Sequence, residues 1–186
     1  GFKEFVVALG YKGEVIKDGE DLAIFAYGHM VNPSLEVAMM LEQKGIRTAV
    51  INARFAKPVD VELVLKYARS TRYLVTVEEH SLKGGFGSAI LEVIQENDAL
   101  ADLHMKRIGV KDIVVEHGAP ALIRRDLELD VESLFKNISG FYLEGEGLNK
   151  NSGEKNSDHA KAQKKTFTEN IKKDRMKDKD KLPVNG

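Results

Sequence analysis

Short apolar segments alternate with helical segments along the first 143 residues, and this alternation limits the possible folds more than any other feature. Short apolar runs bounded by glycine or polar residues predict strands at 21–28, 46–53, 72–79 and 102–110. Apolar residues at helical spacing predict helices at 34–45, 60–70, 86–97, 119–127 and 130–143. Strands that alternate with helices are typical of βαβ units, so we expect a mostly parallel sheet.

One further strand is predicted at 12–19, at the edge of the sheet. It ends in Asp18-Gly19, a pair typical of tight hairpin turns. We therefore expect this first strand to turn directly into the next one and to run antiparallel to the rest. The predicted fold is a three-layer α/β/α sandwich around a mostly parallel sheet of about five strands.

The composition changes near Glu144, which divides the chain into two predicted regions. Residues 1–143 form the α/β domain, whereas residues 144–186 are rich in lysine and poor in apolar side chains. Such a segment buries too little apolar surface to offset its ordering entropy, so we predict a disordered polar tail. Glycines at 145, 147 and 153 favour a linker at its start. A short helix over 158–173 that docks on a partner is the alternative.

Composition also excludes several classes of function. The chain has no cysteine, which rules out disulfides and thiolate metal sites. Its formal net charge of −1 gives no basic field for nucleic acid. There is neither a membrane-length apolar run nor a signal-peptide pattern, so we expect a cytoplasmic protein, or one in a plastid-type organelle. We interpret the start at Gly1 as a processing or artificial boundary, or as a cut inside a longer protein.

Polar residues collect where the predicted parallel strands end, which is the edge where ligands bind in such sheets. These residues are Gly28-His29, Asn52-Ala53-Arg54, Glu78-Glu79-His80 and Gly109-Val110. The stretch VEEHSLKGGFGSAIL at 77–91 is the densest of these, because it passes from a strand through three glycines into a helix.

Two interpretations of that stretch compete. Free N–H groups at a helix start attract anions, but GGFG has neither the P-loop nor the dinucleotide spacing. We favour a structural turn, in which Gly84 and Gly85 bend the backbone and Gly87 lets the helix pack closely on the sheet. Glu78, Glu79 and His80 are a possible acid/base set, although neighbours on a strand point in different directions.

The remaining polar residues of the edge give weaker signals. The spacing of His29, His80 and His117 matches no compact metal signature, so we predict no metal site. Arg54 is a candidate for binding an anion, but an interdomain or intersubunit salt bridge with Glu78 or Glu79 is the favoured role. By themselves, the polar residues of this edge do not form a complete catalytic set.

The motifs in their order resemble the C-terminal domain of the 1-deoxy-D-xylulose-5-phosphate synthases, within the transketolase family. The resemblance runs over about residues 10–140 and is carried by YKGEVIKDGEDLAIFAYGHMV, VINARFAKPVD, YLVTVEEHSLKGGFGSAILE and IGVKDIVVEHG. The alternative resemblance is to the C-terminal domains of transketolase and of the pyruvate dehydrogenase β subunit.

The resemblance implies a full-length enzyme that uses thiamine diphosphate and Mg²⁺ to condense pyruvate with glyceraldehyde 3-phosphate, with loss of CO₂, in isoprenoid synthesis. In that family the cofactor and metal residues lie outside this domain, so no catalytic, cofactor or metal residue is transferred to this chain. The implied partners are the rest of the same synthase chain and a second copy in a homodimer, without nucleic acid or membrane.

The role implied for this domain is an interdomain and dimer surface along the strand-end edge. Its predicted residues are Arg54, Lys57, Pro58, Glu78, Glu79, His80, Gly84, Gly85, Phe86, Gly87, Glu116, His117 and Gly118. Two alternatives remain open at this point. One is a free-standing module that holds a small anion at the helix start, and the other is a partner-recruiting domain of the dehydrogenase β type with the tail as a contact arm.

Overall fold

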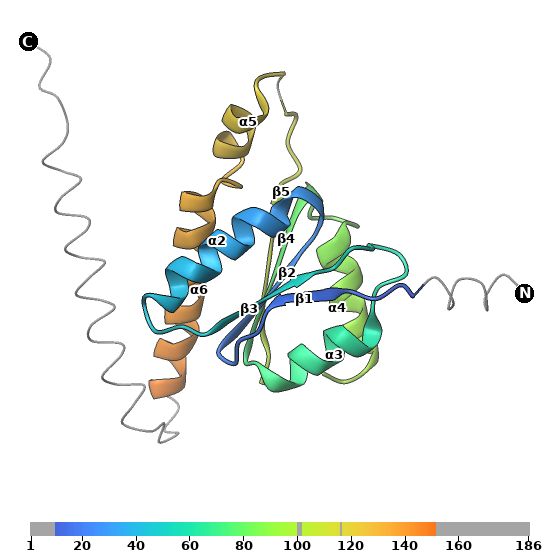
Figure 1. Cartoon of the computed structure of the whole chain (residues 1–186), viewed down its shortest axis with the longest axis vertical. Coiled ribbons are helices and arrows are strands. Elements are labelled where there is room, and N and C mark those ends of the chain that lie inside the picture. Colours follow the sequence, from blue (N-terminus) through green and yellow to red (C-terminus); the bar gives the residue numbers. More distant parts are fainter. Residues whose placement is uncertain (1–9, 100–101, 116, 152–186) are drawn as a thin grey trace, which may run out of the picture. The chain divides into compact units, whose positions relative to one another are not determined.

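The computed structural model describes residues 10–99, 102–115 and 117–151 (Figure 1). The predicted tail beyond residue 151, with its possible helix at 158–173, lies outside the described residues. The chain divides into two compact units, Gly1–Gly145 and Glu146–Gly186. The fold described in the following paragraphs is that of the first unit.

A five-stranded sheet forms the centre of the first unit. Its strands are β1 (Glu14–Lys17), β2 (Leu22–Ala26), β3 (Thr48–Asn52), β4 (Tyr73–Ser81) and β5 (His104–Val110). Their order across the sheet is β1-β3-β2-β4-β5. Strands β2 to β5 pair in parallel and β1 pairs antiparallel with β3. The predicted mostly parallel sheet with an antiparallel first strand is confirmed.

The expected hairpin between the first two strands is wrong, because β3 lies between β1 and β2. A Cβ on Gly19 would run into the backbone at Thr48 and Ala49, so glycine lets the chain pass close to the start of β3. Asp18 accepts hydrogen bonds from the backbone of Gly19 and from the hydroxyl of Tyr67, each at 2.9 Å. Asp18-Gly19 therefore ties the β1–β2 connection to α3 (Val61–Ser70) instead of closing a hairpin.

Helices cover both faces of the sheet. They are η1 (Gly28–Met30, a 3₁₀ turn), α2 (Val31–Glu42), α3 (Val61–Ser70), α4 (Phe86–Glu96), α5 (Pro120–Asp126) and α6 (Val131–Asn151). Figure 1 shows α2 and α6 on one side of the sheet and α3 and α4 on the other, which confirms the three-layer sandwich. No helix in the described part of the chain is both long enough and apolar enough to span a membrane.

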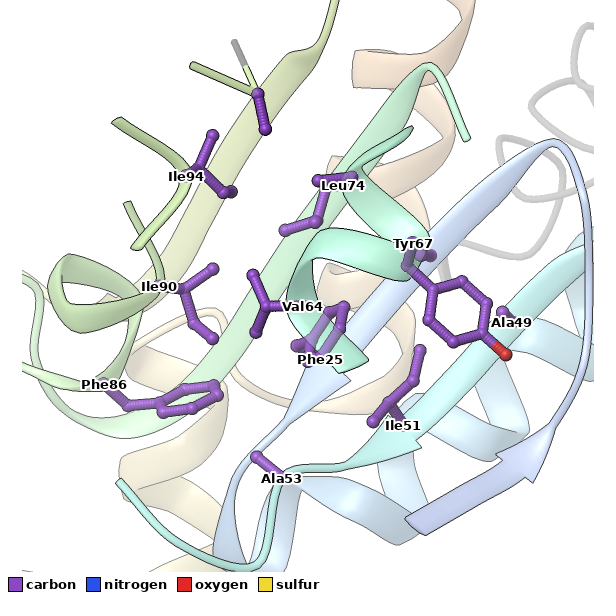
Figure 2. Packing of buried hydrophobic residues seen from close by; sticks show 13 residues of the cluster. Phe25, Ala49, Ile51, Ala53, Val64, Tyr67, Leu74, Phe86, Ile90 and Ile94 are labelled. Carbon is purple, nitrogen blue, oxygen red and sulfur yellow. The ribbon is translucent and has the colours of Figure 1, made fainter. Parts of the chain in front are cut away.

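The core between the sheet and the α3–α4 layer explains why the strands read as continuous apolar runs. All five residues of β2 are buried, since helices cover both of its faces. Figure 2 shows Phe25 of β2 among side chains from α3 and α4, including Val64 and Ile90. The ring of Tyr67 packs edge-on against Phe25 at 6.1 Å. Burial, followed by its hydrogen bond to Asp18, raises the pKa of the Tyr67 hydroxyl to about 12.

The helix ends follow the local sequence signals in part. The Asp60 side chain caps α3 by accepting from the N–H of Leu63 at 3.2 Å, as its position predicts. Helix α6 is longer than expected, because it continues to Asn151. Gly145 is buried inside it, where a Cβ would meet the ring of Tyr73. The interpretation of Gly145 as part of a linker is therefore wrong, because glycine there allows α6 to approach an aromatic side chain of the sheet.

Candidate docking surface

The centre of the strand-end edge is a buried carboxylate. Glu78 lies on β4 with 0% of its surface exposed. Its Oε2 accepts the N–H of Phe86 and its Oε1 accepts the N–H of Gly87, each at 2.7 Å. Both donors belong to the first turn of α4, where backbone N–H groups have no partner within the helix. Glu78 therefore caps α4 from a neighbouring strand, with its negative charge at the positive end of the helix dipole.

This cap decides between the two interpretations of the glycine-rich turn. The next two N–H groups, those of Ser88 and Ala89, donate to the carbonyl of Gly85. The first N–H groups of α4 are therefore occupied from within the chain. An external anion would have to displace a buried carboxylate to reach them, so the helix start is not a free anion site.

The glycines of the turn are required by space and by backbone conformation. Gly84 has φ +72°, a conformation that favours glycine. A Cβ on Gly85 would overlap the carbonyl of Ser81 and lie 2.5 Å from a Glu78 oxygen. A Cβ on Gly87 would lie 2.5 Å from the hydroxyl of Thr76 on β4. The predicted structural turn with close helix–sheet packing is confirmed. The close packing brings the first turn of α4 within hydrogen-bonding distance of the Glu78 carboxylate.

Arg107 on β5 fixes the outer side of the turn. It donates to the carbonyl of Leu82 at 2.9 Å and to the hydroxyl of Ser88 at 2.7 Å. That hydroxyl also donates to Leu82 and accepts the N–H of Gly84. The strand, the turn and the helix are thus held in one arrangement, which presents the surface around them in a defined shape.

A groove of about 710 Å³ runs beside this turn, between α4 and the loop that follows β3. It brings together six of the predicted surface residues, which are Lys57, Pro58, His80, Gly84, Gly85 and Phe86. Tyr27 forms part of the same lining, where its ring stacks on Phe86 at 5.3 Å and lies 5.6 Å from the ring of His80. Lys83 and Glu92 add charges of both signs to the otherwise largely apolar lining.

Glu79 forms a second cluster instead of an acid pair with Glu78. Its Oε1 accepts from Nε of Arg124 on α5 at 2.6 Å, and its Oε2 lies 3.3 Å from Nδ1 of His29. Adjacent positions on β4 point to opposite faces, which separates the two carboxylates. The possible acid/base set of Glu78, Glu79 and His80 is therefore not assembled, because the three side chains have separate partners.

Three of the predicted surface residues are largely buried within the domain itself. Glu78 is fully buried, Phe86 is 3% exposed, and Gly87 is buried against the sheet. The cause is the cap, since the first turn of α4 must face β4 to meet its carboxylate. Glu78 and Gly87 support the surface from beneath, whereas Phe86 contributes a small exposed part to the lining of the groove.

The other predicted residues lie around the edge without a shared site. Arg54 is exposed with φ +59°, and within the described residues its side chain makes no ion pair with Glu78 or Glu79. His117 and Gly118 are exposed, whereas Glu116 lies outside the described residues. The three histidines do not meet, and the described residues hold no cluster of three or more His, Asp or Glu that suits a metal ion.

Sequence reasoning missed an exposed apolar strip next to this edge. Ile113, Val114, Val115 and Leu122 are exposed to 58%, 94%, 42% and 61%. A signal was present in the sequence, because three consecutive β-branched residues follow Lys111-Asp112 outside every predicted strand and helix.

The fold and the glycine-rich turn define an α/β domain of the transketolase type. Residues 11–134 match the family profile described as transketolase, C-terminal domain, and the chain belongs to this family. The family membership expected from the motifs is confirmed.

The curated relatives show which enzymes of this family the chain resembles. The 1-deoxy-D-xylulose-5-phosphate synthase of Thermosynechococcus vestitus is 49% identical over 127 residues, which is 68% of this chain and 20% of that protein. The enzyme of the same name from Halothermothrix orenii is 46% identical over 125 residues, covering 67% and 20%. This chain therefore spans about a fifth of the length of these relatives.

Solved structures agree with the fold. A split-gene transketolase described as an inactive beta4 tetramer matches with a TM-score of 0.65 and 35% identity, over 71% of this chain and 42% of that one. A transketolase mutant from Pichia stipitis matches with a TM-score of 0.52 and 17% identity, over 72% and 18%, and supports the fold alone.

Proposed function

We propose that this chain is the C-terminal docking and dimerisation domain of a 1-deoxy-D-xylulose-5-phosphate synthase. The observation that carries the proposal is its 49% identity to a synthase across 68% of the chain, against 35% to the split-gene transketolase. The complete enzyme condenses pyruvate with glyceraldehyde 3-phosphate and releases CO₂. It acts in the cytoplasm or a plastid-type organelle as a homodimer.

In this proposal the chain supplies no catalytic group. Thiamine diphosphate and Mg²⁺ bind to the parts of the enzyme that precede this domain. The buried cap supports that assignment, because Glu78 fills the helix start that would otherwise attract a phosphate. The split-gene relative, described as inactive in its tetramer, is consistent with a segment that assembles without catalysing.

The docking surface in this proposal is the groove beside α4 together with the rim that carries Glu79. Lys57 and Pro58 form one wall of the groove and α4 forms the other. The buried turn beneath them keeps both walls in place without taking part in binding. The region from residue 152 onward is not required for this role.

Reconstitution tests the proposal. The synthase of Thermosynechococcus vestitus would be expressed without its C-terminal fifth and mixed with this chain. We expect CO₂ release from pyruvate that depends on glyceraldehyde 3-phosphate and on added chain. A matched Lys57→Glu variant should require a higher chain concentration and reach the same plateau, since the residue contributes to docking and not to chemistry.

Two results would contradict it. Restoration of ketose-to-aldose transfer in a similarly truncated transketolase, with none in the synthase, would favour the transketolase alternative. Tight binding of thiamine diphosphate with Mg²⁺ to the isolated chain, measured by calorimetry, would contradict the assignment of the cofactor to the preceding domains.

A further inference from the structure

The groove beside α4 has two walls of opposite charge. One wall is the loop after β3, which carries Lys57, and the other is α4, which carries Glu92 and Glu96. All three side chains are exposed, and none of them forms a hydrogen bond or an ion pair with any residue that the structure describes. Glu92 and Glu96 lie four residues apart on one face of the helix, where like charges repel each other. A positive group beside α4 would relieve that repulsion.

The lining between these charges is apolar. The ring of Tyr27 rests on that of Phe86 and lies 5.6 Å from the ring of His80. The apolar side chains that complete the lining are Ala56, Pro58, Val59, Val61, Ala89 and Val93. An apolar surface with charged groups at its margin is typical of a contact with another protein segment.

The start of the described chain lies against the same loop. Tyr11 packs edge-on against Phe55, with ring centroids 4.9 Å apart. The N–H of Gly13 donates to the side chain of Asp60 at 3.0 Å. These two contacts flank the part of the loop that forms the wall of the groove. The polypeptide that leads into Gly10 is therefore tethered beside the groove, which raises its effective concentration there.

We propose that the groove binds a segment from the preceding part of the synthase chain, with an apolar side chain against Tyr27 and a basic side chain beside Glu92 and Glu96. This inference rests on the proposed function and names the chemistry of its docking partner. An acidic residue of the same segment would face Lys57, so the two walls fix the direction in which the segment lies.

The test uses a mixture of the full 186-residue chain with the Thermosynechococcus vestitus synthase that lacks its C-terminal fifth. Biolayer interferometry measures the dissociation constant of this complex for the wild-type chain and for Glu92→Lys. The matched control is Glu36→Lys, because Glu36 is exposed on α2, on the other side of the sheet (Figure 1), and has no ion pair within the described residues. Circular dichroism checks that both variants keep the fold, and CO₂ release by the wild-type mixture shows that the truncated synthase is competent.

We expect Glu92→Lys to raise the dissociation constant at least about tenfold, because the basic group of the partner would meet a lysine instead of a carboxylate. Added salt should weaken the wild-type complex and narrow that difference. Glu36→Lys should stay within about twofold of wild type. Equal constants for the two variants, with CO₂ release intact, would overturn the inference and leave the proposed function standing. A wild-type chain that neither binds nor restores CO₂ release would contradict the proposed function, and the inference with it.

A photo-crosslinker in the groove identifies the occupant. Val61→p-benzoylphenylalanine places the reactive group on a lining residue that is 42% exposed. Mass spectrometry should map the crosslink to a peptide of the truncated synthase that contains an apolar residue next to a lysine or arginine. Crosslinks that join only two copies of this chain would assign the groove to a second copy, and a crosslinked peptide without a basic residue would remove the argument from charge. Either result would overturn the inference.

Discussion

Replacement of Glu78 by glutamine tests the buried cap directly. The change keeps the size of the side chain but removes its charge, and one of the two accepting oxygens becomes a donor. The N–H that now faces this NH₂ group, either of Phe86 or of Gly87, loses its acceptor inside a site with no exposed surface. The second N–H keeps a hydrogen bond, but to a neutral oxygen.

The magnitude follows from these two losses. A buried donor without a partner costs about 1–3 kcal/mol, and a hydrogen bond to a charged group is worth roughly 1.5–3 kcal/mol against about 1 for a neutral one. The lost interaction with the helix dipole adds up to about 1 kcal/mol. Part of this is offset, because a neutral amide is easier to bury than a carboxylate. We therefore expect Glu78→Gln to lower the free energy of unfolding by about 2–4 kcal/mol.

Urea denaturation followed by circular dichroism measures the effect. With a slope of about 2 kcal/mol per molar urea for a domain of this size, the midpoint should fall by roughly 1–2 M. Glu96→Gln is the control, since Glu96 is exposed on the same helix and the change should stay within about 0.5 kcal/mol. If the two variants were equally stable, the carboxylate of Glu78 would not be holding α4, and the structural explanation of the glycine-rich turn would fail.

Three further predictions concern other parts of the fold. Gly87→Ala should destabilise the domain by about 1–3 kcal/mol in the same assay, because its Cβ would push α4 away from β4. The control is Gly140→Ala on α6, which should be neutral or stabilising by up to about 1 kcal/mol, because the space around Gly140 is open. Burial and the hydrogen bond to Asp18 raise the pKa of Tyr67 from 10.0 to about 12. The stability that this hydroxyl contributes is therefore complete below pH 10 and is lost as the pH rises through 12. The difference in unfolding free energy between wild type and Tyr67→Phe, measured by urea denaturation at several pH values, should shrink over that interval, and a constant difference would contradict this. A chain that ends at Asn151 should keep the thermal midpoint of the full chain within a few degrees in calorimetry, and a much larger fall would mean that the removed region packs on the domain.

The fold was largely predictable because its local signals agree with one another. Buried parallel strands read as apolar runs, and helices between them repeat their apolar residues at helical spacing. The pairing of β1 was not predictable from Asp18-Gly19, since a turn signal gives the bend of the chain but not which strand the chain meets. The full length of α6 was hidden for a related reason, because Gly145 has the propensity of a linker and only the ring of Tyr73 explains its place in a helix.

The site was less predictable than the fold. The sequence correctly indicated where the polar residues gather, because the carboxyl ends of parallel strands share one edge. It did not indicate which of two adjacent acids is buried. Glu78 and Glu79 are equivalent in a sequence pattern, and only the position of α4 over one face of β4 gives the first a pair of backbone donors and the second an arginine.

The position of β1 has a consequence for the order in which the domain can form. Among the described strands β1 pairs with β3 alone, so its ladder cannot start until residues beyond α2 have been synthesised and folded. Three of its four residues are exposed, and the core therefore has little need of it. We expect the parallel strands to assemble first and β1 to close over the edge afterwards. β1, the first of the described strands, is thus the last to join the sheet, and until it does, β3 remains an open edge to which a strand of another molecule can add.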